Sequence, residues 1–177
     1  MQKVKVVALT AIPAIVVATA LFFTGYLYIQ SKEPVPNLPA TQTVQAPTTV
    51  PLNADTIFNL VNQERIKAGV KPLIRDARLD GSAQQKASDM NYSNYFSHVN
   101  PDTAIHGYEL IPDDVCKYRS ENISHYMPPY AGNGNIIVVG NWYNSKSHHD
   151  AMLDPKYDIS GIAISGDKIV QHFCDLK

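Results

Sequence analysis

Tryptophan, cysteine and charge are scarce in this chain, and the scarcity of cysteine and of basic charge narrows the class of protein. One tryptophan and two cysteines occur in 177 residues, and charged residues make up 18% with a net charge of −1. Two cysteines allow at most one disulfide within the chain. No run of basic residues occurs, and acids outnumber bases beyond residue 33, so we expect no nucleic-acid partner. The length fits one domain with appendages.

Charge is absent altogether from residues 6–29. This run is long enough to cross a bilayer as a helix of about 20 residues. Lys3 and Lys5 precede it and should stay cytoplasmic, which sends the C-terminus outward. A cleaved signal peptide is the alternative, but its apolar region usually stops near about 15 residues. We therefore expect residues 1–29 to be a transmembrane anchor at the cell membrane, with secretion after cleavage as the alternative.

Residues 30–52 are rich in Pro, Thr, Gln, Ser and Val and nearly free of charge. Repeated prolines forbid a helix and favour an extended tether. Such a segment cannot bury a core. The sequence therefore predicts that residues 53–177 form the folded domain, outside the cytoplasm.

Hydrophobic periodicity and stop signals predict the elements of this domain. Helices are expected over residues 53–68 and 78–94, and strands over residues 118–124, 158–165 and 168–174. Residues 136–143 fit a strand, because four β-branched residues stand in a row, but they also fit a helix face. Residues 99–117 lack periodicity and are interpreted as a surface excursion of the kind that walls a binding cleft.

Three segments occur in a fixed order: Tyr95-Phe96-Ser97-His98, then Arg119-Ser120-Glu121-Asn122-Ile123, then the stretch from Trp142 through His148-His149. They resemble the bacterial branch of the CAP family (cysteine-rich secretory, antigen 5 and pathogenesis-related proteins, also called SCP domains), and the resemblance spans nearly all of residues 54–174. It implies an α+β fold, an α-β-α sandwich with a small antiparallel sheet between helices. It also implies a helix at residues 136–143.

Two polar residues of the first helix belong to the same resemblance. Leu60-Val61-Asn62 with Arg65 and Gly69 is similar to the opening helix of CAP domains. Ordinary helix surface is the alternative interpretation of Asn62 and Arg65. We interpret both residues as structural rather than chemical.

CAP domains line a cleft with two histidines and one or two glutamates, and the resemblance places these roles on this chain. The histidines fall on His98 and His148, and one glutamate falls on Glu121. The second glutamate of many eukaryotic members would fall on Ser145, so this chain lacks it. His149 stands where many bacterial members have arginine. Neighbouring residues of a helix point about 100° apart, so His148 and His149 cannot both face the cleft squarely.

These residue types leave several interpretations open. Two imidazoles and a carboxylate can hold a divalent cation such as Zn²⁺. The same groups can form a metal-free network in which Glu121 fixes a histidine tautomer, an acid/base pair, or a purely structural cluster. His125 follows Glu121 by four residues and is either a third imidazole near the cleft or a loop histidine, and we favour the loop.

Two functional hypotheses follow from the resemblance. The first is a non-enzymatic extracytoplasmic module that binds a lipid, a glycan, an envelope protein or a divalent cation. The absence of a serine or cysteine nucleophile motif and of a zinc-protease helix motif supports it. The second is a metal-dependent hydrolase or protease of the cell envelope that uses His98, Glu121 and His148.

Cys116 and Cys174 both lie in the part of the chain expected outside the cytoplasm. That compartment permits a disulfide, and two cysteines allow one pairing. The bridge requires Cα atoms about 4.4–6.8 Å apart. A metal site made by the two cysteines alone is the weaker alternative.

Overall fold

The computed structural model describes residues 50–127 and 132–177. The expected anchor at residues 1–29 and nearly all of the tether lie outside this part of the chain. In the described ranges, no helix has the length and apolar character needed to span a membrane.

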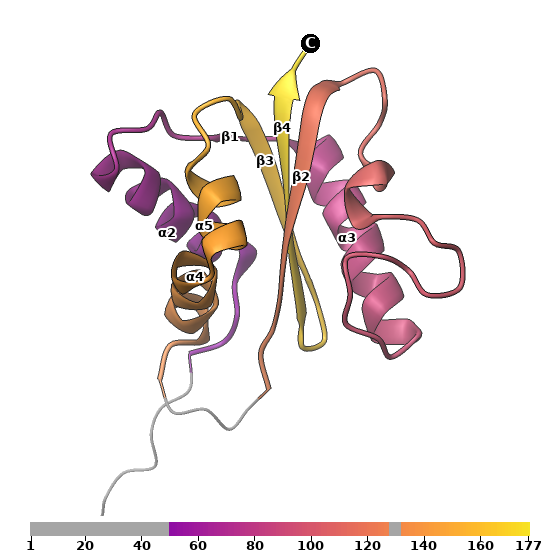
Figure 1. The fold of residues 1–177 in the computed structure, drawn as a ribbon. Helices are drawn as coiled ribbons and strands as arrows, with labels where there is room; N and C mark the ends of the chain where they lie inside the picture. The colour runs from indigo at the N-terminus through magenta and orange to yellow at the C-terminus, as the bar shows by residue number, and fades with distance from the viewer. Residues whose placement is uncertain (1–49, 128–131) are drawn as a thin grey trace, which may run out of the picture. The chain divides into compact units, whose positions relative to one another are not determined.

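The described residues form nine helices and strands (Figure 1). They are α2 (Ala54–Lys67), β1 (Ile74–Arg75), α3 (Ala77–Tyr92), the 3-10 helix η1 (Gly107–Leu110), β2 (Cys116–His125), α4 (Gly134–Asn144), α5 (Lys146–Leu153), β3 (Ile159–Ser165) and β4 (Lys168–Leu176). The predicted helices and strands are present. The strand expected over residues 118–124 begins earlier and ends one residue later.

The elements form three layers, and the middle layer is a four-stranded sheet of order β1-β3-β4-β2. Helices α2, α4 and α5 cover one face of the sheet, and α3 with η1 covers the other (Figure 1). The expected α-β-α arrangement is therefore present. The expected wholly antiparallel sheet is wrong at one edge, because β1 pairs with β3 in parallel. A strand of two residues is too short to leave a period-2 pattern in the sequence.

Close packing of α3 on the sheet depends on a glycine in β3. A Cβ atom added at Gly161 would lie 2.2 Å from the backbone of both Leu79 and Asp80. The side chain of Asp80 then accepts a hydrogen bond from the backbone N–H of Ile162 at 2.9 Å. Helix α3 thus lies directly against β3, an inner strand of the sheet.

The ambiguous segment at residues 136–143 belongs to helix α4, as the family resemblance implies. Asn133 caps the helix by accepting from the backbone N–H of Asn135. Val138 and Trp142, four residues apart, are both buried in the core. The indole Nε1 of Trp142 donates to the carbonyl of Ile123 at 3.0 Å, and so satisfies a backbone acceptor of the edge strand β2.

Asn62 and Arg65 are structural residues, and the alternative of ordinary helix surface is wrong for Arg65. The Asn62 side chain accepts from the N–H of Leu73 at 2.8 Å and donates to its carbonyl at 3.0 Å. Arg65 is fully buried. Both side chains tie α2 to the chain that follows it.

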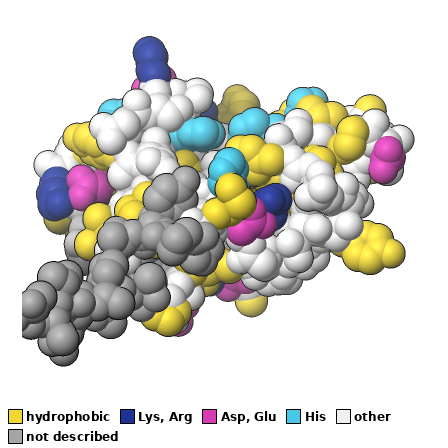
Figure 2. Space-filling view, turned by 90° about the horizontal axis from the view of Figure 1, so that it is seen from below, with side chains coloured by type: hydrophobic (Ala, Val, Ile, Leu, Met, Phe, Trp, Pro, Cys, Tyr) yellow, Lys and Arg dark blue, Asp and Glu magenta, His cyan; other side chains and the backbone are white. Residues whose placement is uncertain are grey.

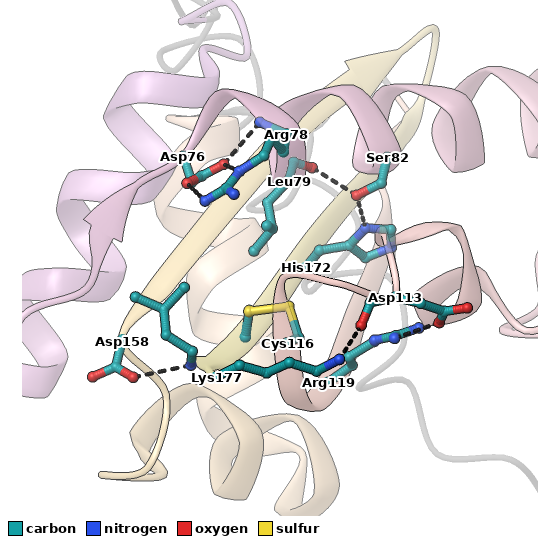
Figure 3. The surroundings of a disulfide bond; sticks show 12 residues. Asp76, Arg78, Leu79, Ser82, Asp113, Cys116, Arg119, Asp158, His172 and Lys177 are labelled. Carbon is teal, nitrogen blue, oxygen red and sulfur yellow. Dashed lines mark hydrogen bonds and ion pairs between the residues drawn. A yellow bond between two sulfur atoms is a disulfide. The ribbon is translucent and has the colours of Figure 1, made fainter.

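The predicted disulfide between Cys116 and Cys174 is confirmed (Figure 3). The two Cα atoms lie 5.4 Å apart. The bridge joins the first residue of β2 to the neighbouring strand β4, and both cysteines are buried against Leu79 and Ile159.

Candidate functional site

A buried carboxylate, that of Glu121 on β2, lies at the centre of the site. Its side chain is 1% exposed. One oxygen, Oε1, lies 2.7 Å from Nδ1 of His98, and the other, Oε2, lies 3.0 Å from Nε2 of His172. The register of β2 and β4 places Glu121 directly opposite His172, so the two side chains leave the same face of the sheet.

The long excursion between α3 and β2 closes over this carboxylate with its backbone. The N–H of Gly107 donates to the carbonyl of His98 at 2.8 Å. A Cβ atom added at Gly107 would lie 1.7 Å from Oε2 of Glu121. Only a glycine leaves room for the carboxylate in its observed position.

Hydrogen bonding keeps Glu121 ionised despite its burial. Burial alone would raise the pKa of Glu121, but the hydrogen bonds from His172 and His98, with the nearby charge of Lys86, lower it overall. An ionised carboxylate only accepts hydrogen bonds. Nδ1 of His98 must therefore carry the hydrogen, and in the neutral ring Nε2 keeps its lone pair.

A cleft of about 280 Å³ lies beside this cluster, along the edge of β2. It is lined by Phe96, Ile123, Ser124, His125, Asn141, Trp142, Ser145 and His148. The ring centroids of His98 and His148 lie 6.0 Å apart. Burial, and then the charge of His98, lowers the pKa of His148, which favours its neutral form. The cleft thus combines imidazole nitrogens with aromatic surface.

Helix α5 delivers His148 to the cleft through a buried amide. The side chain of Asn122 on β2 donates to the carbonyl of His148 at 3.0 Å. The neighbouring His149 turns away, and its ring lies edge-on against Tyr143 with 4.9 Å between centroids. This contact holds α5 against β2 with His148, and not His149, lining the cleft.

The structure brings together the residues that the sequence pointed to, with two corrections. Glu121 is buried beneath His98, so it does not share the solvent-reachable cleft in which we expected all three side chains to meet. His125 is the last residue of β2 and lines the cleft, its ring edge-on to Phe96 at 4.8 Å, so its interpretation as a loop histidine is wrong. Ser145 lines the cleft. Histidine side chains gather among apolar ones on the face shown in Figure 2.

A cation in this cleft would have few protein ligands. Among residues 50–127 and 132–177, no group of three or more His, Cys, Asp or Glu side chains is arranged to hold a metal ion. His98 offers Nε2 and His148 offers a ring nitrogen, while Glu121 stands behind His98 as its hydrogen-bond acceptor. Catalytic zinc sites have three protein ligands. The donor set fits a weakly held cation and not a catalytic zinc centre.

Two residues of the site, His172 and Gly107, were not found by sequence reasoning. His172 stands in a predicted strand, but its position opposite Glu121 depends on a strand register that the sequence does not give. In the sequence, Gly107 indicates only a turn within the aperiodic segment 99–117. Its contact with Glu121 joins positions fourteen residues apart through tertiary folding.

Comparison with known proteins identifies the family. The family model described as "Cysteine-rich secretory protein family" (CAP) matches residues 58–174. YkwD, an uncharacterized protein of Bacillus subtilis strain 168, is 31% identical over 147 residues, which are 81% of this chain and 55% of YkwD. YlbC, an uncharacterized membrane protein of the same strain, is 30% identical over 118 residues, 66% of this chain and 33% of YlbC. This chain thus spans about half of the first relative and a third of the second.

Two solved structures share the fold. An extracellular protein containing an SCP domain from Bacillus anthracis superposes with a TM-score of 0.60 at 21% identity, covering 71% of this chain and 44% of that protein. An outer surface protein from Borrelia burgdorferi gives a TM-score of 0.60 at 18% identity, covering 70% of this chain and 92% of that protein. With the family match across residues 58–174, these findings show that the chain belongs to the CAP family, in its bacterial form.

Proposed function

We propose that this chain is a ligand-binding module of the cell envelope, held at the membrane by its N-terminal segment with the CAP domain outside the cytoplasm. The uncharged run at residues 6–29 and the disulfide support this placement. The descriptions of the similar proteins agree, since one is a membrane protein, one is extracellular and one is an outer surface protein.

Placement is tested by adding protease to intact cells. We expect the CAP domain to be digested while cytoplasmic proteins survive, and we expect the chain in the membrane fraction. A full-length, protease-protected protein in the soluble cytoplasmic fraction would contradict the placement.

The observation that carries the binding proposal is the hydrogen bond between Glu121 and Nδ1 of His98. It leaves the lone pair of His98 Nε2 available beside His148 and the cleft. When both rings are neutral, these two imidazoles can accept hydrogen bonds from a polar ligand or share a divalent cation. Bound in this way, a cation would supply positive charge to attract an anionic ligand group.

The alternative of a metal-dependent hydrolase or protease has less support. A general base must reach a water or substrate proton within hydrogen-bond distance. Both oxygens of Glu121 are already engaged by imidazoles, and its side chain is 1% exposed. With two imidazoles as the candidate ligands, the site favours binding over hydrolysis.

A calorimetric titration of the purified chain with Zn²⁺ tests the cation form of the proposal. We expect binding much weaker than the roughly 10–16 kcal/mol of structural zinc sites, because two protein ligands are fewer than four. The His98→Ala, His148→Ala double variant should lose it. Binding should also weaken as the pH falls through the histidine range, because only neutral imidazole binds a cation.

His149→Ala is the matched control, since it removes the neighbouring histidine that lies against Tyr143 instead of the cleft. This variant should bind Zn²⁺ as the wild type does. Unchanged binding in the double variant would remove the cation site and leave a module that binds its ligand without a cation.

A further inference from the structure

We propose that His172 is a positioning residue of the cleft. It holds the Glu121 carboxylate through Nε2–H, and through that carboxylate it fixes His98 as the tautomer with hydrogen on Nδ1 and a free lone pair on Nε2. This inference rests on the proposed binding function of the cleft. Its own test reads the His98 tautomer and requires no ligand.

His172 is placed where it acts on the cleft without entering it. It lies on β4 between Glu121 on β2 and Gly161 on β3, and it is fully buried. Both ring nitrogens are engaged: Nε2 lies 3.0 Å from Oε2 of Glu121, and Nδ1 lies 2.8 Å from Oγ of Ser82. A ligand in the cleft therefore meets His148, which lines it, with the ring of His98 beside it, while His172 acts through Glu121.

The hydrogen-bond partners require a hydrogen on Nε2 of His172. Figure 3 shows the contacts of Ser82 with Nδ1 of His172 and with the Leu79 carbonyl. If the Ser82 hydroxyl donates to the Leu79 carbonyl at 3.1 Å, it must accept from Nδ1–H, and Nε2 then also needs a hydrogen to face the ionised carboxylate. If the hydroxyl donates to Nδ1 instead, the neutral ring carries its hydrogen on Nε2. A ring with hydrogen on Nδ1 alone would set its Nε2 lone pair against a carboxylate oxygen, so it is excluded.

The Nε2–H group of His172 fixes both the rotation and the position of the Glu121 carboxylate. Each oxygen of Glu121 has one imidazole partner, His98 on Oε1 and His172 on Oε2. Gly107 closes over Oε2 so tightly that a methyl group would not fit. Outer partners of this kind orient a histidine and select its tautomer. Without the His172 donor, Oε2 would be a buried acceptor with an empty partner position, and the carboxylate would turn to find another donor.

The competing interpretation is that His172 merely fills the layer between the sheet and α3. A filling role requires volume, whereas a positioning role requires an N–H at the place of Nε2. Substitutions that separate these two properties decide between them. Leucine keeps much of the volume without a donor, asparagine keeps an amide donor on a side chain too short to reach Glu121, and glutamine keeps a donor at greater reach.

The experiment is ¹⁵N NMR of the purified chain with labelled histidine, in which the two ring nitrogens of His98 report the tautomer. The wild type should show a single His98 form with hydrogen on Nδ1. His172→Leu and His172→Asn should shift His98 toward the form with hydrogen on Nε2, and His172→Gln should restore the wild-type signature. Ser82→Ala is the control: it removes the partner of Nδ1, leaves Nε2–H in place and should leave the His98 tautomer unchanged.

A Zn²⁺ titration of the same variants gives a second readout, with an expected loss of about 10–100-fold in affinity for His172→Asn. Circular dichroism shows which variants are folded. If His172→Leu does not fold, the test rests on His172→Asn. A folded His172→Leu or His172→Asn variant that keeps the wild-type His98 tautomer overturns the proposal. If the wild type binds no Zn²⁺ and the tautomer still responds, the cation proposal fails and the role of His172 stands.

Discussion

Replacing Arg65 with alanine is expected to lower the free energy of unfolding by about 3–5 kcal/mol. Arg65 lies on α2 and is fully buried. Its guanidinium donates to the carbonyls of Lys71 (2.8 Å), Met152 (2.8 Å), Asp154 (3.1 Å) and Tyr157 (3.3 Å). Without the guanidinium, these acceptors would remain in the interior without their donor, and each unsatisfied group costs about 1–3 kcal/mol.

The position of these carbonyls explains why so large an effect is expected. Met152 and Asp154 are at the C-terminal end of α5, where the last carbonyls have no partner within the helix. The planar guanidinium reaches several of them at once, whereas a lysine ammonium is a point charge on a flexible stem. Arg65→Lys should therefore recover only part of the loss. Because α5 carries His148, the Arg65→Ala substitution should also loosen the cleft.

Urea unfolding followed by circular dichroism measures the effect. Lys67→Ala is the matched control, because Lys67 is on the same helix with a side chain 67% exposed and a surface pair to Glu64. It should stay within about 0.5 kcal/mol of the wild type. An Arg65→Ala variant as stable as the control would show that the carbonyls find other partners.

For Arg65, the structural role could be predicted from the sequence, but its partners could not. Its place in the opening helix indicated a structural role, and the structure confirms that role. The partners could not be predicted, because Met152, Asp154 and Tyr157 follow it by more than eighty residues along the chain. Helical periodicity tells which face a residue occupies and carries no information on what that face meets.

Some residues of the candidate site could be located from the sequence and others could not. His98, Glu121 and His148 stand in motifs whose order and spacing survive in a single sequence, so the resemblance could locate them. His172 and Gly107 have their roles through strand register and close backbone approach, neither of which leaves a local pattern. The parallel edge strand β1 was missed for a related reason, because two residues show no alternation.

Removing the disulfide by the Cys116→Ala, Cys174→Ala double substitution is expected to lower the free energy of unfolding by roughly 4 kcal/mol. The two cysteines are 58 residues apart in sequence. In the unfolded chain the bridge closes a long loop and removes conformational freedom, which makes unfolding less favourable. In the folded chain, Arg119 already pairs with Cys174 in the β2–β4 ladder, so the bridge changes the native strands little. The loss should therefore appear in stability while the Glu121–His172 pair and the cleft remain.

Urea unfolding with and without dithiothreitol, at equilibrium, measures this loss. Reductant should bring the wild type down to the stability of the double variant and leave that variant unchanged. Both cysteines are buried, at 3% and 0% exposure, so reduction requires opening of the fold and should be slow in the absence of urea. A double variant within about 1 kcal/mol of the oxidised wild type would contradict the loop-closure account. In that case β2 and β4 would be held chiefly by the hydrogen bonds of their ladder and by apolar packing around Leu79 and Ile159.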